Sequence, residues 1–161
     1  MVKENLIMEN VRIIFKNFRG LEQQFNSEGD RNFCVPIDDM EEVERLSEMG
    51  WNIKHTNPKK EGIEPIYYLQ VAVSYKKIEP NIYMVTNDKP VRLSESTVGN
   101  LDSADIRSAD IIISPYNWEV NGKSGTKAYC KTMYVNIDED VFAGKYQGGP
   151  ILNDMDEDMA F

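Results

Sequence analysis

The chain has 161 residues, 41% of them hydrophobic, and a net charge of −9, which fits one domain with a sizeable core. No apolar run reaches the roughly 18 residues needed to span a bilayer, and the first residues lack the basic region and long apolar core of a secretory signal. We therefore expect a cytoplasmic protein with reduced thiols at Cys34 and Cys130. With His55 as the single histidine, a structural zinc site has too few ligands, so we expect neither metal nor cofactor.

The first half of the chain alternates short strand patterns with polar loops. Alternating apolar residues predict strands over 9–18, 32–37 and 51–55. Pro36 removes a backbone donor, so its strand should end there or lie at a sheet edge. Between the second and third strands, 40–49 has helical spacing of apolar residues, with Asp39 before it and Gly50 after it as capping signals.

The second half contains the clearest strand and two hairpins. Residues 66–75 alternate cleanly, with apolar side chains at every second position. Asn87–Pro90 separates two short apolar runs and predicts a hairpin turn, and 94–102 predicts a short capped helix. A last short helix is expected from Asp138, packing on the rest through Val141, Phe142 and Tyr146.

The longest hairpin is predicted over 111–137, where Asn121–Gly125 separates two runs rich in β-branched and aromatic residues. Period-two alternation places Tyr129, Lys131 and Met133 on one side of its second strand. Aromatic rings and ammonium groups gather on this hairpin at Tyr116, Trp118, Lys123, Lys127, Tyr129 and Lys131. Such a combination stacks bases while neutralising phosphates, although aromatic residues are also common in ordinary strands.

Five or more strands with short helices and no βαβ alternation predict a mainly β fold. An OB-fold-like antiparallel Greek-key barrel suits the number and length of the strands. The domain is expected over 1–146, followed by a flexible acidic tail over 147–161 that begins at a Gly-Gly-Pro joint.

The net charge of −9 does not exclude an anionic ligand, because the charges are unevenly distributed. The strand-rich segments 1–20, 66–93 and 107–137 each carry +2, whereas 21–65, 94–106 and 138–161 carry −6, −3 and −6. Phosphate is attracted by a local patch, so the sign of the whole molecule is a poor guide.

The tail combines acids with apolar groups and a terminal aromatic residue. Its candidate partner-binding residues are Asp154, Asp156, Glu157, Asp158 and Phe161. Phe161 brings a ring and the terminal carboxylate together, which a basic pocket on a partner protein can bind. The alternative is a tail that only solvates the chain end.

With the motif DMDEDMAF at 154–161 and the segment SPYNWEVNGKSGTKAYCKTMYV at 114–135, the chain resembles the single-stranded DNA-binding proteins of phage replication systems. These pair an OB-fold barrel with an acidic tail ending in phenylalanine. The resemblance implies coating of displaced strands, cooperatively or as a homodimer, in the cytoplasm of a host cell. It also implies tail contacts to polymerase, helicase-primase or recombination proteins. This tail is shorter and less acidic than many, and the helix at 40–49 is absent from a minimal OB barrel.

Our leading hypothesis is a non-enzymatic, sequence-independent binder of single-stranded DNA in replication or recombination. The candidate nucleic-acid-binding residues are Arg12, Lys16, Tyr67, Lys76, Tyr116, Trp118, Lys123, Lys127, Tyr129 and Lys131. Trp118 and Tyr67 fit a core position equally well. The alternative is a β-barrel interaction protein that binds a basic partner through its tail without contacting DNA. A metal-dependent nuclease using Asp102, Asp105 and Asp110 is less favoured, because most acids in the chain are explained by positions in loops and at helix starts, where they cap helices. His55 is better explained as a surface imidazole than as a catalytic base.

Overall fold

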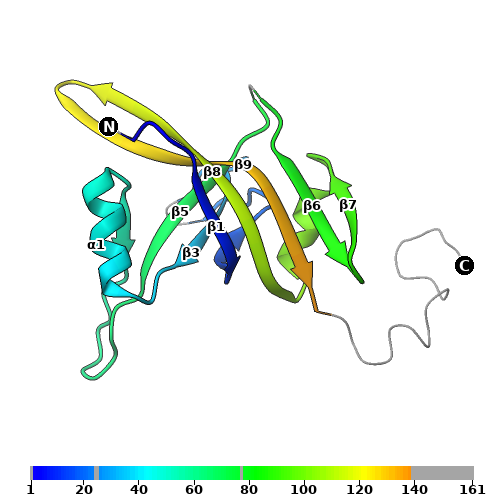
Figure 1. Ribbon diagram of the computed structural model, residues 1–161, viewed down its shortest axis with the longest axis horizontal. Coiled ribbons are helices and arrows are strands. Elements are labelled where there is room, and N and C mark those ends of the chain that lie inside the picture. Colours follow the sequence, from blue (N-terminus) through cyan, green and yellow to red (C-terminus); the bar gives the residue numbers. More distant parts are fainter. Residues whose placement is uncertain (1, 24–25, 77, 139–161) are drawn as a thin grey trace, which may run out of the picture.

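The computed structural model describes residues 2–23, 26–76 and 78–138 (Figure 1). The strands are β1 (Leu6–Val11), β2 (Ile14–Asn17), β3 (Arg31–Pro36), β4 (Ile53–His55), β5 (Tyr67–Val73), β6 (Asn81–Thr86), β7 (Lys89–Leu93), β8 (Ile106–Val120) and β9 (Lys123–Ile137). The helices are α1 (Met40–Met49) and the 3₁₀ helix η1 (Val98–Ser103). No helix in these ranges is long and apolar enough to cross a membrane. The predicted helix after Asp138 and the acidic tail lie outside the described residues.

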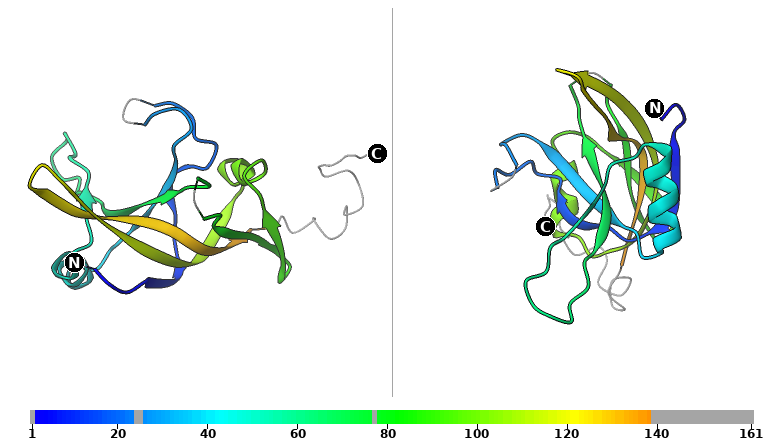
Figure 2. Two further views of the ribbon diagram at one scale, coloured as in Figure 1. Left: turned by 90° about the horizontal axis from the view of Figure 1, so that it is seen from above. Right: turned by 90° about the vertical axis from the view of Figure 1, so that its left-hand side faces the viewer.

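The β8–β9 hairpin is the longest element and runs from one end of the fold to the other (Figure 2). Its two 15-residue strands pair antiparallel from Ile106–Ile137 to Val120–Lys123. The turn consists of Asn121 and Gly122, both with positive φ, 52° and 78°. Asn and Gly adopt this conformation at low cost, and a two-residue turn of this kind matches the twist of paired strands. The predicted hairpin is confirmed, with a shorter turn than the pentapeptide suggested.

The sheet is ordered β1-β8-β9-β5-β3-β2, with β4 on β5 and the β6–β7 hairpin on β9. The predicted mainly β, OB-like fold with short helices is confirmed. The sheet is mixed rather than purely antiparallel, because β5 and β6 both run parallel to β9. A parallel pair needs a connection that returns the chain to the same end. Such connections leave no simple signature in the alternation of one strand.

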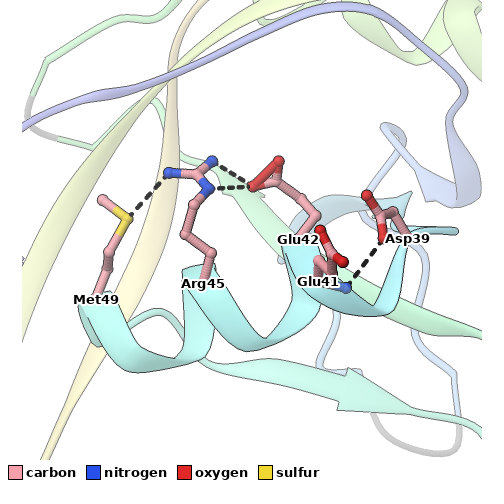
Figure 3. Close-up of polar contacts among 5 residues, drawn as sticks. All are labelled: Asp39, Glu41, Glu42, Arg45 and Met49. Carbon is pink, nitrogen blue, oxygen red and sulfur yellow. Dashed lines mark hydrogen bonds and ion pairs between the residues drawn. The ribbon is translucent and has the colours of Figure 1, made fainter.

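The helix α1 lies beside the barrel at the end nearer the hairpin turn (Figure 1). Val43 and Leu46 form its buried stripe. Asp39 Oδ1 accepts a hydrogen bond from the Glu41 amide at 3.0 Å, which caps the helix start (Figure 3). At the other end Gly50 takes the left-handed conformation, φ 114°, that the sequence predicted. The caps and the buried stripe fix α1 against the core.

A bulge in β9 overturns the predicted side-chain alternation. Ile112 pairs with Thr132 whereas Ile113 pairs with Cys130, so Lys131 is the extra residue. Buried side chains therefore fall at even positions before the bulge and at odd positions after it. Tyr129 and Met133 point to opposite faces instead of sharing one. The bulge lies where the second neighbour of β9 changes from β5 to β6.

The single strand predicted over 9–18 is in fact two strands, β1 and β2. Asn10 and Phe15 have positive φ, 53° and 51°, and the chain changes partner between them from β8 to β3. An exposed Phe at positive φ is uncommon, and tertiary pairing rather than local preference sets it here. By contrast, β3 does end at Pro36, as its missing donor predicted.

Candidate nucleic-acid interface

A groove of about 700 Å³ opens on the outer face of the sheet, between the β8–β9 hairpin and the segment that leads into β3. We call it the β9 groove. Its lining residues come from β3, β4, β5, β8, β9 and the loops beside them: Asn26, Gly29, Asp30, Arg31, Asn32, Asn52, Lys54, Leu69, Gln70, Ala72, Val73, Ser74, Tyr75, Lys76, Glu95, Trp118, Thr126, Lys127, Ala128 and Tyr129. Three aromatic and four basic side chains therefore face one hollow.

Trp118 lies flat against a glycine in the opposite strand. Gly125 pairs with Trp118 across the hairpin, and a Cβ added to Gly125 would lie 2.7 Å from Trp118 Cζ2. That spacing is too short for any side chain, so the glycine is what lets the indole approach the backbone. Trp118 is still 37% exposed. The ring is thus fixed on one side and open to a ligand on the other.

Tyr129 places a second ring in the groove, beside a lysine. Lys127 Nζ lies 5.2 Å from the centroid of the Tyr129 ring, within the range of a cation–π contact. Tyr116 meets the same ring edge-on, with centroids 6.1 Å apart. Tyr116 is 52% exposed and pairs in register with Lys127. Two tyrosine rings and the Lys127 ammonium group therefore lie together on the hairpin.

The opposite side of the groove supplies further cations. Lys54 Nζ donates a 2.7 Å hydrogen bond to Gln70 Oε1, which holds the ammonium at the groove without neutralising it. Lys76 is exposed. The acids that line the groove are Asp30 and Glu95, against four basic residues. The groove is therefore locally cationic in a molecule of net charge −9.

The structure brings some of the predicted residues together and separates others. Those that line the groove are Lys76, Trp118, Lys127 and Tyr129. Tyr116 neighbours them on the hairpin, Lys123 lies at its turn and Lys131 at the bulge. Six predicted residues do not line the groove, and three of these lie outside the β8–β9 hairpin as well: Arg12, Lys16 and Tyr67. Arg12 Nη2 lies 3.7 Å from Asp38 Oδ1. Tyr67 is half-buried against the core, and the centroid of its ring lies 5.4 Å from that of His55.

Lys16 on β2 contacts the end of η1 through its ammonium group. Its Nζ donates hydrogen bonds of 2.9 Å to the Leu101 carbonyl and 2.7 Å to the Ala104 carbonyl. These carbonyls belong to η1 and the residue that follows it. The Leu101 carbonyl also accepts a hydrogen bond from the Ala104 amide at 3.3 Å, so Lys16 and the backbone together cap this end of η1. Strand alternation alone gave no sign of this contact.

The groove residues that the sequence reasoning missed include Arg31, Lys54, Gln70 and Tyr75. Gln70 lies on the outer face of β5, opposite the buried Leu69 and Val71, so alternation alone would have found it. Arg31 and Lys54 reach the groove only because β3 and β4 both pair with β5. That pairing is tertiary information, and no local motif carries it.

Two of the three carboxylates considered for a nuclease, those of Asp102 and Asp110, bind backbone amides. Asp102 accepts hydrogen bonds from the amides of Phe18 and Arg19 at 2.8 and 2.9 Å, and Asp110 accepts one from the Asn10 amide at 2.8 Å. Within the described ranges, no three His, Cys, Asp or Glu side chains gather where they could hold a metal ion.

Both cysteines are buried free thiols. Burial raises the pKa of the Cys34 thiol to about 11 and that of the Cys130 thiol to about 12. Such thiols stay protonated and unreactive near neutral pH, which fits the expectation of reduced cysteines.

The fold and groove together define an OB-like barrel with a cationic, aromatic outer surface. A family model described as "Putative phage ssDNA-binding domain" matches residues 1–160. The chain belongs to this family. No curated protein matches it.

Among solved structures, the chain is similar to a single-stranded DNA-binding protein from bacteriophage Enc34. The C-terminally truncated form has a TM-score of 0.55 at 11% identity, covering 85% of this chain and 87% of that one. The form described as in complex with ssDNA has the same TM-score and identity, with 85% and 88% covered. A further structure of that protein gives a TM-score of 0.54 at 10% identity, covering 85% and 83%. At such identity the likeness shows the shared fold alone.

Proposed function

We propose that the β9 groove binds single-stranded DNA without sequence preference. Bases stack on the rings of Trp118 and Tyr129, while Lys54, Lys76 and Lys127 neutralise phosphates. The observation that carries this proposal is the single groove in which an open indole, a tyrosine and these three lysines meet. Every base has a π-face, so stacking of this kind tolerates any sequence. Family membership and the Enc34 protein described as bound to ssDNA support the same ligand.

The strand continues beyond the groove along the hairpin arm. Tyr116 adds a ring that is more than half exposed, and Lys123 and Lys131 add charges along β9. Arg12, Lys16 and Tyr67 are not part of this proposed path, because Arg12 faces Asp38, the Lys16 ammonium binds two carbonyls and Tyr67 packs against the core. Binding requires no chemistry at the DNA, so the protein acts without catalysis.

In this proposal the protein coats and protects displaced strands during phage DNA replication and recombination. We assign DNA binding to residues 1–146, and recruitment of replication or recombination proteins to residues 147–161. The tail's four acids and terminal Phe161 support this role. Deleting residues 151–161 tests it: DNA affinity stays equal or rises, while capture of the partner protein is lost.

Tryptophan fluorescence during a salt-stepped titration with oligo(dT) tests the DNA-binding proposal. Trp118 is exposed in the groove, whereas Trp51 is 3% exposed and does not line it. Stacking quenches Trp118 alone, so Trp118→Phe abolishes the quench and Trp51→Phe preserves it. Affinity falls steeply with salt, because each neutralised phosphate releases counter-ions. No quench and flat salt dependence would instead favour the barrel that binds only a protein partner.

A further inference from the structure

Arg31 stands apart from the other cations of the β9 groove because a ring fixes its head. Its Cζ lies 5.6 Å from the centroid of the Tyr75 ring, and its side chain is only 20% exposed. Its Nε is buried without a hydrogen-bond partner among the described residues, so a ligand in the groove meets the terminal nitrogens. Burial raises the pKa of Tyr75 to about 12, and the ring therefore stays neutral beside the guanidinium. The guanidinium is preorganised whether or not an acid is paired with it.

The acid that pairs with Arg31 is held loosely. Glu95 Oε2 lies 3.4 Å from Arg31 Nη1, and the Glu95 side chain is 60% exposed. Charge-assisted hydrogen bonds normally lie near 2.7–2.9 Å. An exposed carboxylate keeps much of its hydration, so a pair of this kind adds little stability. Glu95 can leave Arg31 at small cost.

Arg31 is also the one groove cation in an ion pair within the described ranges. Lys54, Lys76 and Lys127 face the groove without a carboxylate partner in that part of the chain. A guanidinium binds two oxygens of one phosphate in a fork that an ammonium cannot match. The strongest phosphate-binding group of the groove is therefore the one that an acid occupies.

We infer that Arg31 is a phosphodiester ligand of the β9 groove and that Glu95 is its exchangeable counter-ion in the free protein. This inference rests on the proposed binding of single-stranded DNA. When a strand enters, a phosphate replaces the Glu95 carboxylate on the preplaced guanidinium. In the free protein Glu95 cancels that charge and so weakens the attraction for stray anions. Glu95 thereby sets the affinity without touching the DNA.

Anisotropy titrations with labelled oligo(dT) over a salt series test the exchange. Glu95→Gln binds about two- to fivefold more tightly, because no weak ion pair must break. Arg31→Gln binds about tenfold more weakly, and the slope of log affinity against log salt becomes shallower by about 0.7. Arg31→Lys keeps the charge but loses the fork, so it retains the slope and loses affinity. Thermal melting of each variant confirms that the fold is intact.

The matched control is Asp30→Asn, which removes the other acid of the groove; no ion pair joins Asp30 to Arg31 in the described ranges. If Glu95 acts through Arg31, the gain from Glu95→Gln disappears in the Arg31→Gln background, while any gain from Asp30→Asn persists. If the wild type binds oligo(dT) and the Arg31→Gln variant has the same affinity and the same salt slope, this inference is overturned and the proposed function stays intact. A wild-type protein that does not bind oligo(dT) would overturn both.

Discussion

Replacing Trp118 with alanine removes the most accessible ring of the β9 groove. Base–aromatic stacking contributes about 1–3 kcal/mol per base, and we expect a loss of oligo(dT) affinity of about 5- to 150-fold. The indole is 37% exposed and rests on Gly125 rather than in the core. Its removal should therefore lower the free energy of unfolding by only about 1 kcal/mol. The variant separates binding from stability.

Fluorescence anisotropy at one fixed salt concentration measures the affinity, and urea unfolding measures the stability. Trp118→Phe is the matched control, because a phenyl ring keeps a stacking face and should retain most of the affinity. The slope of affinity against salt should not change in either variant, since no phosphate contact is lost. The reasoning is refuted if Trp118→Ala binds as tightly as the wild type, or if its affinity falls only in proportion to a loss of folded protein.

Three other features give predictions of known sign. Gly125→Ala should weaken oligo(dT) binding while the protein stays folded, because the added methyl displaces the Trp118 ring; unchanged anisotropy would show that the ring position is unimportant. Lys16→Met should lower the free energy of unfolding by about 2–3 kcal/mol and leave DNA affinity unchanged, since its ammonium binds carbonyls; lost affinity in a stable variant would restore it to the interface. The raised pKa values of Cys34 and Cys130 mean that the folded state holds these protons more tightly. Their stabilising contribution should be constant below about pH 9 and fall as the pH rises through 11 to 12, and Cys→Ala variants in urea titrations should lose that dependence.

Much of the fold follows from local signals in the sequence. Asn121 and Gly122 set the long hairpin, Asp39 and Gly50 delimit α1, and the alternation over 67–73 gives the buried face of β5. The features that local signals missed depend on which strands become neighbours. The bulge at Lys131 is an example. It lies at the point along β9 where the parallel neighbour of this strand changes from β5 to β6.

About half of the candidate site was predictable for the same reason. Trp118, Lys127 and Tyr129 lie on one hairpin, so their proximity follows from strand geometry alone. Arg31 and Lys54 come from other strands and join them only through the pairing of β3 and β4 with β5. A positively charged residue in a strand carries no mark of whether it will meet phosphate or, like Lys16, the end of a helix.

A second aromatic pair provides an internal comparison for locating the DNA. Tyr83 on β6 and Tyr134 on β9 have stacked rings, with centroids 4.7 Å apart and an interplanar angle of 8°. Both lie beyond the bulge, and neither lines the groove. The rings of the groove and this pair therefore report different surfaces of one protein.

Photo-crosslinking of an oligonucleotide containing 5-iodouracil, followed by mass spectrometry of the peptides, tests the central claim most directly. Crosslinks should fall on Trp118 and Tyr129, in the groove where rings and lysines meet, and should decline as salt is raised. Crosslinks confined to Tyr83 and Tyr134, with none in the groove, would contradict the account.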